Sequence, residues 1–185
     1  MKAGFGRLDH AVIVRDALPG ELAEVGDIRL AAYRAGGHMS PDSGYAPVLR
    51  ALGSEGDGTV LVAVADPVAD PVAGPGGGPV LGTVMLQYWP DGGQVVTSEH
   101  EAEIRALAVA PEGQRQGTGR ALLHAAIERA ERAGVTNLVL LTQPSMRAAQ
   151  YLYRQAGFRR LPDRDWSPRP GVTLLAYGLP LPASR

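Results

Sequence analysis

Runs of β-branched and other apolar residues divide the chain into short segments that end at turn-forming residues. The run at 137–142 is apolar almost throughout, as expected of a strand buried on both faces. Pro and Gly close several of these runs, for example Pro19-Gly20 and Pro111-Glu112-Gly113. Seven strands are predicted, at 12–14, 59–65, 80–88, 102–110, 137–142, a short one from Phe158, and 172–179.

Other segments repeat their apolar residues at the spacing of a helix face. Four helices are predicted: from Glu21 to Gly36, over 45–52, over the apolar stripe 122–130 up to Gly134, and from the N-cap Ser145 through Ala156. No internal repeat is apparent. The order of strands and helices predicts a mixed α/β sheet with helices packed against it.

Residues 66–79 read DPVADPVAGPGGGP, and this density of Pro and Gly prevents both helix and strand. We interpret the segment as a long, flexible hairpin connection between two strands. A linker between two domains is the alternative, but too little chain precedes it for a separate hydrophobic core. We therefore expect residues 1–185 to form a single domain.

The charge and residue composition exclude several classes of function. The 18 Lys and Arg nearly balance the 19 Asp and Glu, so no net field attracts nucleic acid or an anionic membrane. The chain has no Cys, and its four His lack metal-ligand spacing, so no metal site is expected. No stretch approaches the roughly 20 apolar residues that span a bilayer, and the first residues lack the apolar core of a signal peptide. We expect a cytoplasmic protein with no nucleic-acid or membrane partner.

The segment from Val109 to Leu123 joins a strand to an amphipathic helix through a glycine-containing loop. Gly117 and Gly119 leave room for a ligand beside the backbone, and the first N–H groups of a helix have no acceptor within it. The helix dipole and two nearby arginines favour an anion such as a pyrophosphate. The loop lacks the Lys of a nucleotide-hydrolysing loop and the third Gly of a dinucleotide fingerprint. A simple turn remains the alternative.

Three motifs in order resemble the GNAT superfamily of acyl-CoA-dependent N-acetyltransferases. The sequence at 114–119, QRQGTG, matches every fixed position of the family signature [QR]-x-x-G-x-[GA]. The resemblance continues upstream over 103–111, EIRALAVAP, and downstream over 149–158, AQYLYRQAGF. It covers about residues 101–160, whereas the N-terminal half matches only in the order of its elements.

This resemblance implies a GNAT fold and acetyl-CoA as the cofactor. The fold would have a twisted, mixed, mostly antiparallel sheet of about seven strands, flanked by four helices and splayed between the fourth and fifth strands. The coenzyme A pantetheine arm would enter the splay, and backbone amides would hold the pyrophosphate. The implied cofactor-binding residues are Leu107, Ala108, Val109, Gln114, Arg115, Gln116, Gly117, Thr118, Gly119 and Arg120.

The resemblance also implies two catalytic residues. Glu103 would accept a proton from the attacking amine, and Glu101 on the same strand face would raise the pKa of one carboxyl. An exposed carboxylate or a pair with Arg105 is the alternative interpretation of Glu103. Tyr153 would donate a proton to the leaving thiolate, unless it is only a core aromatic residue. Met146 stands where the family often has an Asn that contacts the cofactor.

The resulting hypothesis is an enzyme that acetylates a primary amine of a small molecule by direct attack in a ternary complex. Several acidic residues could favour a cationic acceptor, although solvated loop acids are the ordinary interpretation. The alternatives are an acetyltransferase for a protein N-terminus or lysine, and a noncatalytic acyl-CoA sensor. A free edge strand is also compatible with a homodimer. The acids considered are Asp42, Glu99, Glu101, Asp163 and Asp165.

Overall fold

Eight strands and four α-helices organise the residues that the structure describes. This structure is a computed structural model, and it describes residues 12–40, 42–65, 78–90 and 95–182. The strands are β1 (Val12–Asp16), β2 (Thr59–Ala65), β3 (Val80–Tyr88), β4 (Glu101–Val109), β5 (Asn137–Thr142), β6 (Arg159–Arg160), β7 (Trp166–Arg169) and β8 (Val172–Pro180). The helices are α1 (Leu22–Ala35), α2 (Ala46–Ala51), α3 (Thr118–Arg132) and α4 (Arg147–Gln155), with short 3-10 turns η1 (Pro19–Glu21), η2 (Pro111–Gly113) and η3 (Pro162–Arg164).

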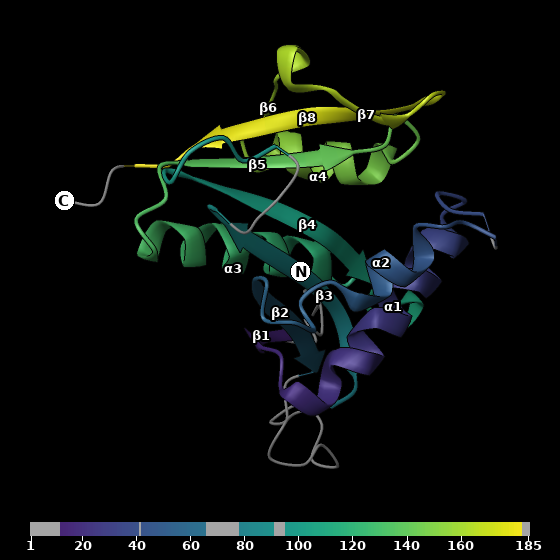
Figure 1. Ribbon diagram of the computed structural model, residues 1–185. Helices are drawn as coiled ribbons and strands as arrows, with labels where there is room; N and C mark the ends of the chain where they lie inside the picture. The colour runs from purple at the N-terminus through teal and green to yellow at the C-terminus, as the bar shows by residue number, and fades with distance from the viewer. Residues whose placement is uncertain (1–11, 41, 66–77, 91–94, 183–185) are drawn as a thin grey trace, which may run out of the picture.

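The strands lie in the order β1-β2-β3-β4-β5-β8-β6, and β7 pairs with β8. β4 and β5 are parallel, whereas the other described pairs are antiparallel. The β4–β5 ladder is short and ends with Ile104 opposite Leu140. Beyond this pair the two strands diverge, as Figure 1 shows. The predicted mixed sheet, splayed between the fourth and fifth strands, is therefore confirmed.

A bulge bends β4 where the divergence begins. In the register with β3, β4 carries two residues, Ala106 and Leu107, where β3 carries one. Ala106 has a φ of 49°, a left-handed conformation that residues with a side chain seldom adopt. The extra residue shifts the alternation of side chains. As a result Ile104, before the bulge, and Leu107, its second residue, pack in the same apolar cluster. The bulge therefore lets β4 turn away from β5 while both of its halves keep a packed face.

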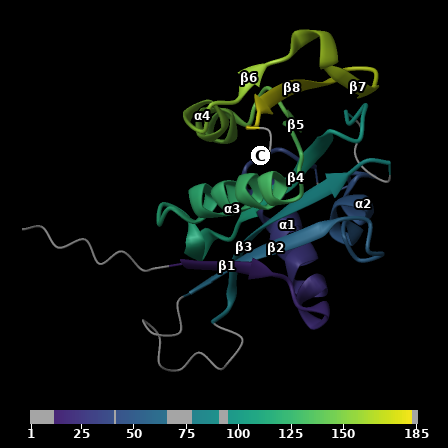
Figure 2. The ribbon, with the colours of Figure 1, turned by 90° about the vertical axis from the view of Figure 1, so that its left-hand side faces the viewer.

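Helices cover both faces of this sheet, α3 and α4 on one side and α1 and α2 on the other (Figure 2). Leu122 and Leu123 of α3 pack in one core with Ala102 and Ile104 of β4. Val25, Leu49 and Met85 belong to a second core, between α1, α2 and the opposite face of the sheet. Because side chains alternate along a strand, Glu103 faces α1 and α2.

The structure confirms most of the predicted elements and corrects two of them. The antiparallel pairing of β2 with β3 confirms a hairpin there, although residues 66–77 of its connection lie outside the described residues. The sequence did not predict β7 as a strand, because Ser167-Pro168-Arg169 lacks an apolar alternation. The prediction of Ser145 as an N-cap was wrong: Met146 precedes α4, and no side chain caps the helix.

No helix in the described ranges is long and apolar enough to cross a membrane.

A buried ion pair ties the connection between β6 and β7 to the start of β4. The guanidinium of Arg164 donates to both carboxylate oxygens of Glu101, at 2.6 and 2.8 Å, and also to the carbonyl oxygen of Val95. Thr97 donates to the same carboxylate through its backbone N–H and its hydroxyl, and Asn137 adds a further hydrogen bond. The hydrogen bonds from Arg164 in particular lower the pKa of Glu101 to about 2. Glu101 is therefore not a carboxyl whose pKa is raised, because Arg164 compensates its charge.

Glu101→Gln should lower the free energy of unfolding by about 2 kcal/mol, since it leaves part of the Arg164 charge unpaired. The pKa of Glu101 is about 2 in the folded chain and 4.5 ordinarily, so the ion pair stabilises the fold fully above about pH 4.5 and is lost as the pH falls through 2. Urea denaturation at pH 7 and pH 3 measures both effects. Glu99→Gln, at an exposed neighbouring position, is the control. Equal stability of the two variants at pH 7 would contradict this assignment.

Candidate functional site

The loop before α3 presents a row of backbone amides without acceptors. Gly117 is the N-cap of α3 with a φ of 83°, and Arg115 also has a positive φ, of 60°. The amide of Gln114 donates to the carbonyl of Pro111 at 3.3 Å. Within the described ranges, the next amide that donates to the backbone is that of Ala121, to the carbonyl of Gly117 at 2.9 Å. The preceding N–H groups, from residue 115 to 120, therefore stand free at the positive end of a 15-residue helix. An anion is the complementary ligand.

Two side chains of this loop donate hydrogen bonds to its own backbone carbonyls and leave the space in front of Gly117 open. The Thr118 hydroxyl donates to the Gly113 carbonyl at 2.7 Å, and the Gln116 amide donates to the Glu112 carbonyl at 2.6 Å. A Cβ atom built on Gly117 would meet no described atom within 4 Å. The space in front of Gly117 is therefore available to a ligand.

The first turn of α3 lies between the end of β4 and α4. A Cβ atom on Gly119 would lie 3.6 Å from side-chain atoms of both Val109 and Leu152. From this turn a groove of about 290 Å³ continues between α3 and α4. It is lined by Arg120, Leu123, His124, Leu152, Gln155 and Ala156. The open amides thus connect to a surface groove on one side and to the splayed strands on the other.

Beyond Ile104, the edge of β4 that faces β5 has no strand partner. Leu107, Ala108 and Val109 lie on this stretch, and the opposite edge of β4 remains paired with β3. The Gln114 side chain donates to the carbonyl of Val109 at 3.4 Å, which links the amide loop to the strand. An extended ligand could pair with this free edge in the way that a strand does.

Glu103 lies one residue before the point where β4 and β5 separate. Only 2% of this residue is exposed, and its carboxylate oxygen lies 3.9 Å from Nε of Arg105. Arg105 also donates to Gln87 at 2.6 Å, and Gln87 donates to Asp57. The carboxylate therefore belongs to a chain of polar side chains on the face of the sheet that α1 and α2 cover. Of the two alternatives to a catalytic role, the exposed edge carboxylate is wrong, whereas the pair with Arg105 is present.

Tyr153 approaches the separation from the opposite face. It is 6% exposed, and its ring centroid lies 5.9 Å from that of Phe158 and 6.3 Å from that of Tyr177. Burial raises the pKa of Tyr153 well above its ordinary value, and Tyr33 on α1 raises it further. The phenol is therefore protonated near neutral pH.

The loop after α1 closes the wide end of this gap. Nδ1 of His38 lies 3.0 Å from the hydroxyl of Ser145, and the Gln143 side chain donates to the His38 carbonyl at 3.0 Å. Ser145 thus binds another loop instead of capping α4. Sequence reasoning missed this contact because the residues are more than 100 positions apart.

Sequence reasoning also missed Arg29, which no solvent reaches. Its Nη1 donates to the carbonyl of Leu52 at 2.6 Å, whereas Nε and Nη2 have no partner within the described ranges. Burial lowers the pKa of Arg29 to about 10. A signal was present: positions 25, 29 and 33 share the inner face of α1, and position 29 is the charged one.

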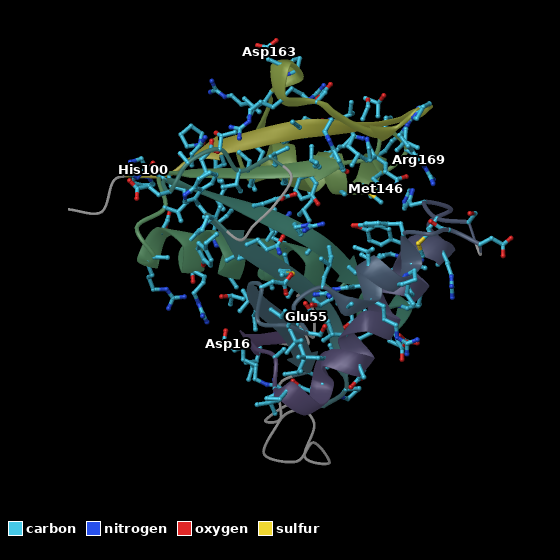
Figure 3. The ribbon with its side chains drawn as sticks, in the orientation of Figure 1. Asp16, Glu55, His100, Met146, Asp163 and Arg169 are labelled. Carbon is cyan, nitrogen blue, oxygen red and sulfur yellow. The ribbon has the colours of Figure 1, made fainter. Side chains whose placement is uncertain are left out.

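The acidic residues proposed for the acceptor pocket do not gather there. Glu101 pairs with Arg164, and Asp165 pairs with Arg160 at 2.7 Å. Asp163 lies on η3, at the far side of β8 from α1, as Figure 3 shows. The described residues next to the gap include two arginines, Arg29 and Arg105, on the side of α1.

Comparison with known proteins agrees with this geometry. Residues 33–158 match the family described as the acetyltransferase (GNAT) family, which is about two thirds of the chain. The chain belongs to the GNAT acetyltransferase family. Solved structures with the same fold include one in complex with coenzyme A and one with acetyl-CoA.

Two relatives share part of the sequence or the fold of this GNAT acetyltransferase. The chain is 47% identical over 58 residues to the [ribosomal protein bS18]-alanine N-acetyltransferase of Escherichia coli. This match spans 31% of the chain and 39% of the relative. The crystal structure of the Escherichia coli ribosomal-protein-S18-alanine N-acetyltransferase has the same fold, with a TM-score of 0.66, 22% identity, and coverage of 95% of this chain and 97% of that one. The PaiA N-acetyltransferase of Thermoplasma acidophilum, solved in complex with coenzyme A, has a TM-score of 0.66 at 15% identity over 92% of this chain and 99% of that one.

The residues of this GNAT acetyltransferase fit acetyl-CoA at two places. The unpaired amides at 115–120 suit a diphosphate, and the unpaired edge of β4 suits an extended amide-containing arm. The two places meet at Gly119, where a Cβ atom would lie 3.6 Å from the Val109 side chain at the end of β4.

Gly117→Leu should weaken coenzyme A binding by at least about tenfold, because the new side chain occupies the open space in front of the amides. Gly134→Leu is a matched control, since Gly134 has a φ of 80°, an open surrounding and a position at the other end of α3. Both variants should lose about 1–2 kcal/mol of stability from the left-handed conformation. Isothermal titration with coenzyme A, after a thermal melt of each variant, measures the difference. Equal affinities in the two variants would contradict the site.

Proposed function

We propose that the chain transfers the acetyl group of acetyl-CoA to a primary amine by direct attack in a ternary complex. One observation supports this proposal: Glu103 precedes the last β4–β5 pair, Ile104 with Leu140, on one face of the sheet, and Tyr153 packs in the cluster that contains this pair on the other face. The amide loop lies at the head of the adjacent helix. A proton acceptor, a proton donor and an anion-binding loop therefore surround one gap.

Ten residues would bind the acyl donor, which supplies a thioester carbonyl to the reaction. The backbone amides of the loop, with the side chains of Gln114 and the two arginines, would hold the diphosphate. Leu107, Ala108 and Val109 would pair through their backbone with the pantetheine arm. A free N–H near Val109 would also donate to the carbonyl oxygen as negative charge develops on it. The loop residues are Gln114, Arg115, Gln116, Gly117, Thr118, Gly119 and Arg120.

Glu103 would act as the general base. A primary amine with a pKa of about 10.4 is neutral in only about one molecule in a thousand near pH 7, so a proton acceptor increases the reactive fraction. The carboxylate is buried on the side of α1 and α2, and it would take the proton through a water molecule. The Nε atom of its neighbour Arg105 lies 3.9 Å from it, and this positive charge favours the ionised carboxylate that a base requires.

Tyr153 would act as the general acid. Its phenol is buried, its pKa is raised, and it therefore retains the proton that a departing thiolate needs. The rings of Phe158 and Tyr177 hold it from two sides. With no Cys in the chain, direct transfer to the amine is favoured over an acyl-enzyme.

The first candidate for the acceptor is a small molecule with a primary amine. The second is the N-terminus of a protein, and the sequence similarity to the Escherichia coli bS18-alanine N-acetyltransferase supports it. A screen of amino acids, polyamines and N-terminal peptides for thiol release from acetyl-CoA tests both. If none of these acceptors leads to thiol release while coenzyme A still binds, a noncatalytic sensor would be favoured.

Glu103→Gln should lower kcat/KM by about 10²-fold or more at pH 7 and leave coenzyme A affinity within about twofold. Without the base, the rate should rise about tenfold for each pH unit up to the pKa of the amine, because only the neutral amine reacts. A pH profile of thiol release measures this, and Glu99→Gln is the exposed control. An unchanged rate at pH 7 would exclude Glu103 as the base.

Tyr153→Phe should lower kcat by about 10²-fold, with little change in coenzyme A binding, because it removes only the proton donor. Tyr151→Phe is a matched control on the same helix, since Tyr151 is 61% exposed. Single-turnover thiol release measures the chemical step. If the two variants react at the same rate, Tyr153 is a core residue and the acid lies elsewhere.

A further inference from the structure

The proposed reaction leaves one buried charge without a role. Arg29 is 0% exposed, and a single described hydrogen bond, to the carbonyl of Leu52, engages its guanidinium. Its Nε and Nη2 groups have no partner within the described ranges. A buried guanidinium without a counter-ion destabilises a fold, and folding alone does not favour it over an apolar residue.

The helix around Arg29 shows that its position is fixed. Arg29 lies on α1 between Val25 and Tyr33, one turn from each, on the face that packs against the sheet. A Cβ atom on Gly26 would lie 2.7 Å from Arg50, so α1 and α2 are in close contact at this level. Arg29 therefore cannot swing out to solvent without separating the two helices.

Arg29 lies on the side of the sheet that carries the proposed base. Its helix, α1, packs against β4. Glu103 and Arg105 of β4 lie 3.9 Å apart on the face that α1 and α2 cover. The unpaired N–H groups of Arg29 are therefore on the same side of the sheet as Glu103.

The balance of charge in this region favours an acceptor that brings an oxygen or a negative charge. Arg29 and Arg105 are both cations, and Asp57 is engaged by the Gly53 amide and by Gln87. Glu103 lies 3.9 Å from Arg105 and would take the proton of the amine. A polycation would meet the buried guanidinium of Arg29 and the partly buried one of Arg105, whereas a carboxylate or carbonyl oxygen would accept from the free N–H groups of Arg29.

We propose that Arg29 determines acceptor specificity by donating from Nε and Nη2 to a carboxylate or carbonyl oxygen that the acceptor carries next to its amine. The acceptor enters beside Tyr45, which is 41% exposed at the start of α2. A free amino acid and the first residue of a peptide share this chemistry. The inference rests on the proposed acetyl transfer to an amine and names the class of that amine.

Three acceptors of similar size test which group next to the amine Arg29 recognises. At this position L-alanine has a carboxylate, L-alaninamide has an amide carbonyl, and isopropylamine has a methyl group. In Arg29→Met, kcat/KM should fall at least about tenfold for the acceptor that carries the recognised oxygen and stay within about threefold for isopropylamine. Each value is compared with the wild-type value for the same acceptor, so differences in amine pKa cancel. Arg50→Met, at an exposed arginine of α2 paired with Asp27, is the control and should change none of them.

A binding measurement tests the contact without turnover. The Nε–H signal of Arg29, assigned in a ¹H–¹⁵N spectrum by its loss in Arg29→Met, should shift when L-alanine or L-alaninamide is added to the coenzyme A complex. Isopropylamine should not shift it. Arg29→Lys, which keeps the charge but not the paired donors, should lose most of the selectivity and provides a second variant if Arg29→Met does not fold.

Equal losses for all three acceptors, or an Nε–H signal that neither alanine nor its amide shifts, would overturn the role of Arg29. A larger loss with alanine identifies a carboxylate, and a larger loss with alaninamide identifies a carbonyl of a peptide-like acceptor. Failure of the proposed function is distinct: no amine would release thiol from acetyl-CoA. In that case the Nε–H signal still decides whether Arg29 receives an oxygen ligand.

Discussion

The loss of hydrogen bonding between β4 and β5 after Ile104 and Leu140 is the constraint on which the rest of the structure depends. A parallel pair inside a sheet normally continues, because unpaired backbone groups are costly when buried. Here the bulge at Ala106 and Leu107 turns β4 aside, and its free edge becomes a place where another extended chain can bond. The backbone groups that the fold leaves unpaired on this edge can therefore form hydrogen bonds with a ligand.

The sheet also separates the chemical tasks. The amides before α3 and the buried phenol of Tyr153 belong to the side of α3 and α4, whereas Glu103 and two guanidinium groups belong to the side of α1 and α2. The gap is where the two sides meet, so donor and acceptor could approach from opposite directions. Burial in its own core raises the pKa of the Tyr153 phenol, and the charged groups lie on the other face of the sheet.

Local patterns were sufficient to predict most of the fold. The apolar runs located seven of the eight strands, and β7 escaped because it pairs only at the end of a hairpin and carries no apolar alternation. The glycine loop could be predicted because its motif is formed by consecutive residues, 114–119, and requires no distant contact. The partners of Glu101 were not, since Arg164 lies 63 positions away and nothing in either local sequence indicates the pair. The sequence shows Arg29 as a charged residue on an apolar helix face. That its Nε and Nη2 groups lack a partner could not be predicted, because this depends on how distant segments pack around it.

The contact of His38 with Gln143 and Ser145 has a consequence for which molecules fit. The β4–β5 ladder closes the narrow end of the gap. At the wide end, the two hydrogen bonds that join the loop after α1 to the segment between β5 and α4 both come from side chains. The size of the head group that passes this end is therefore sensitive to single substitutions at His38, Gln143 or Ser145.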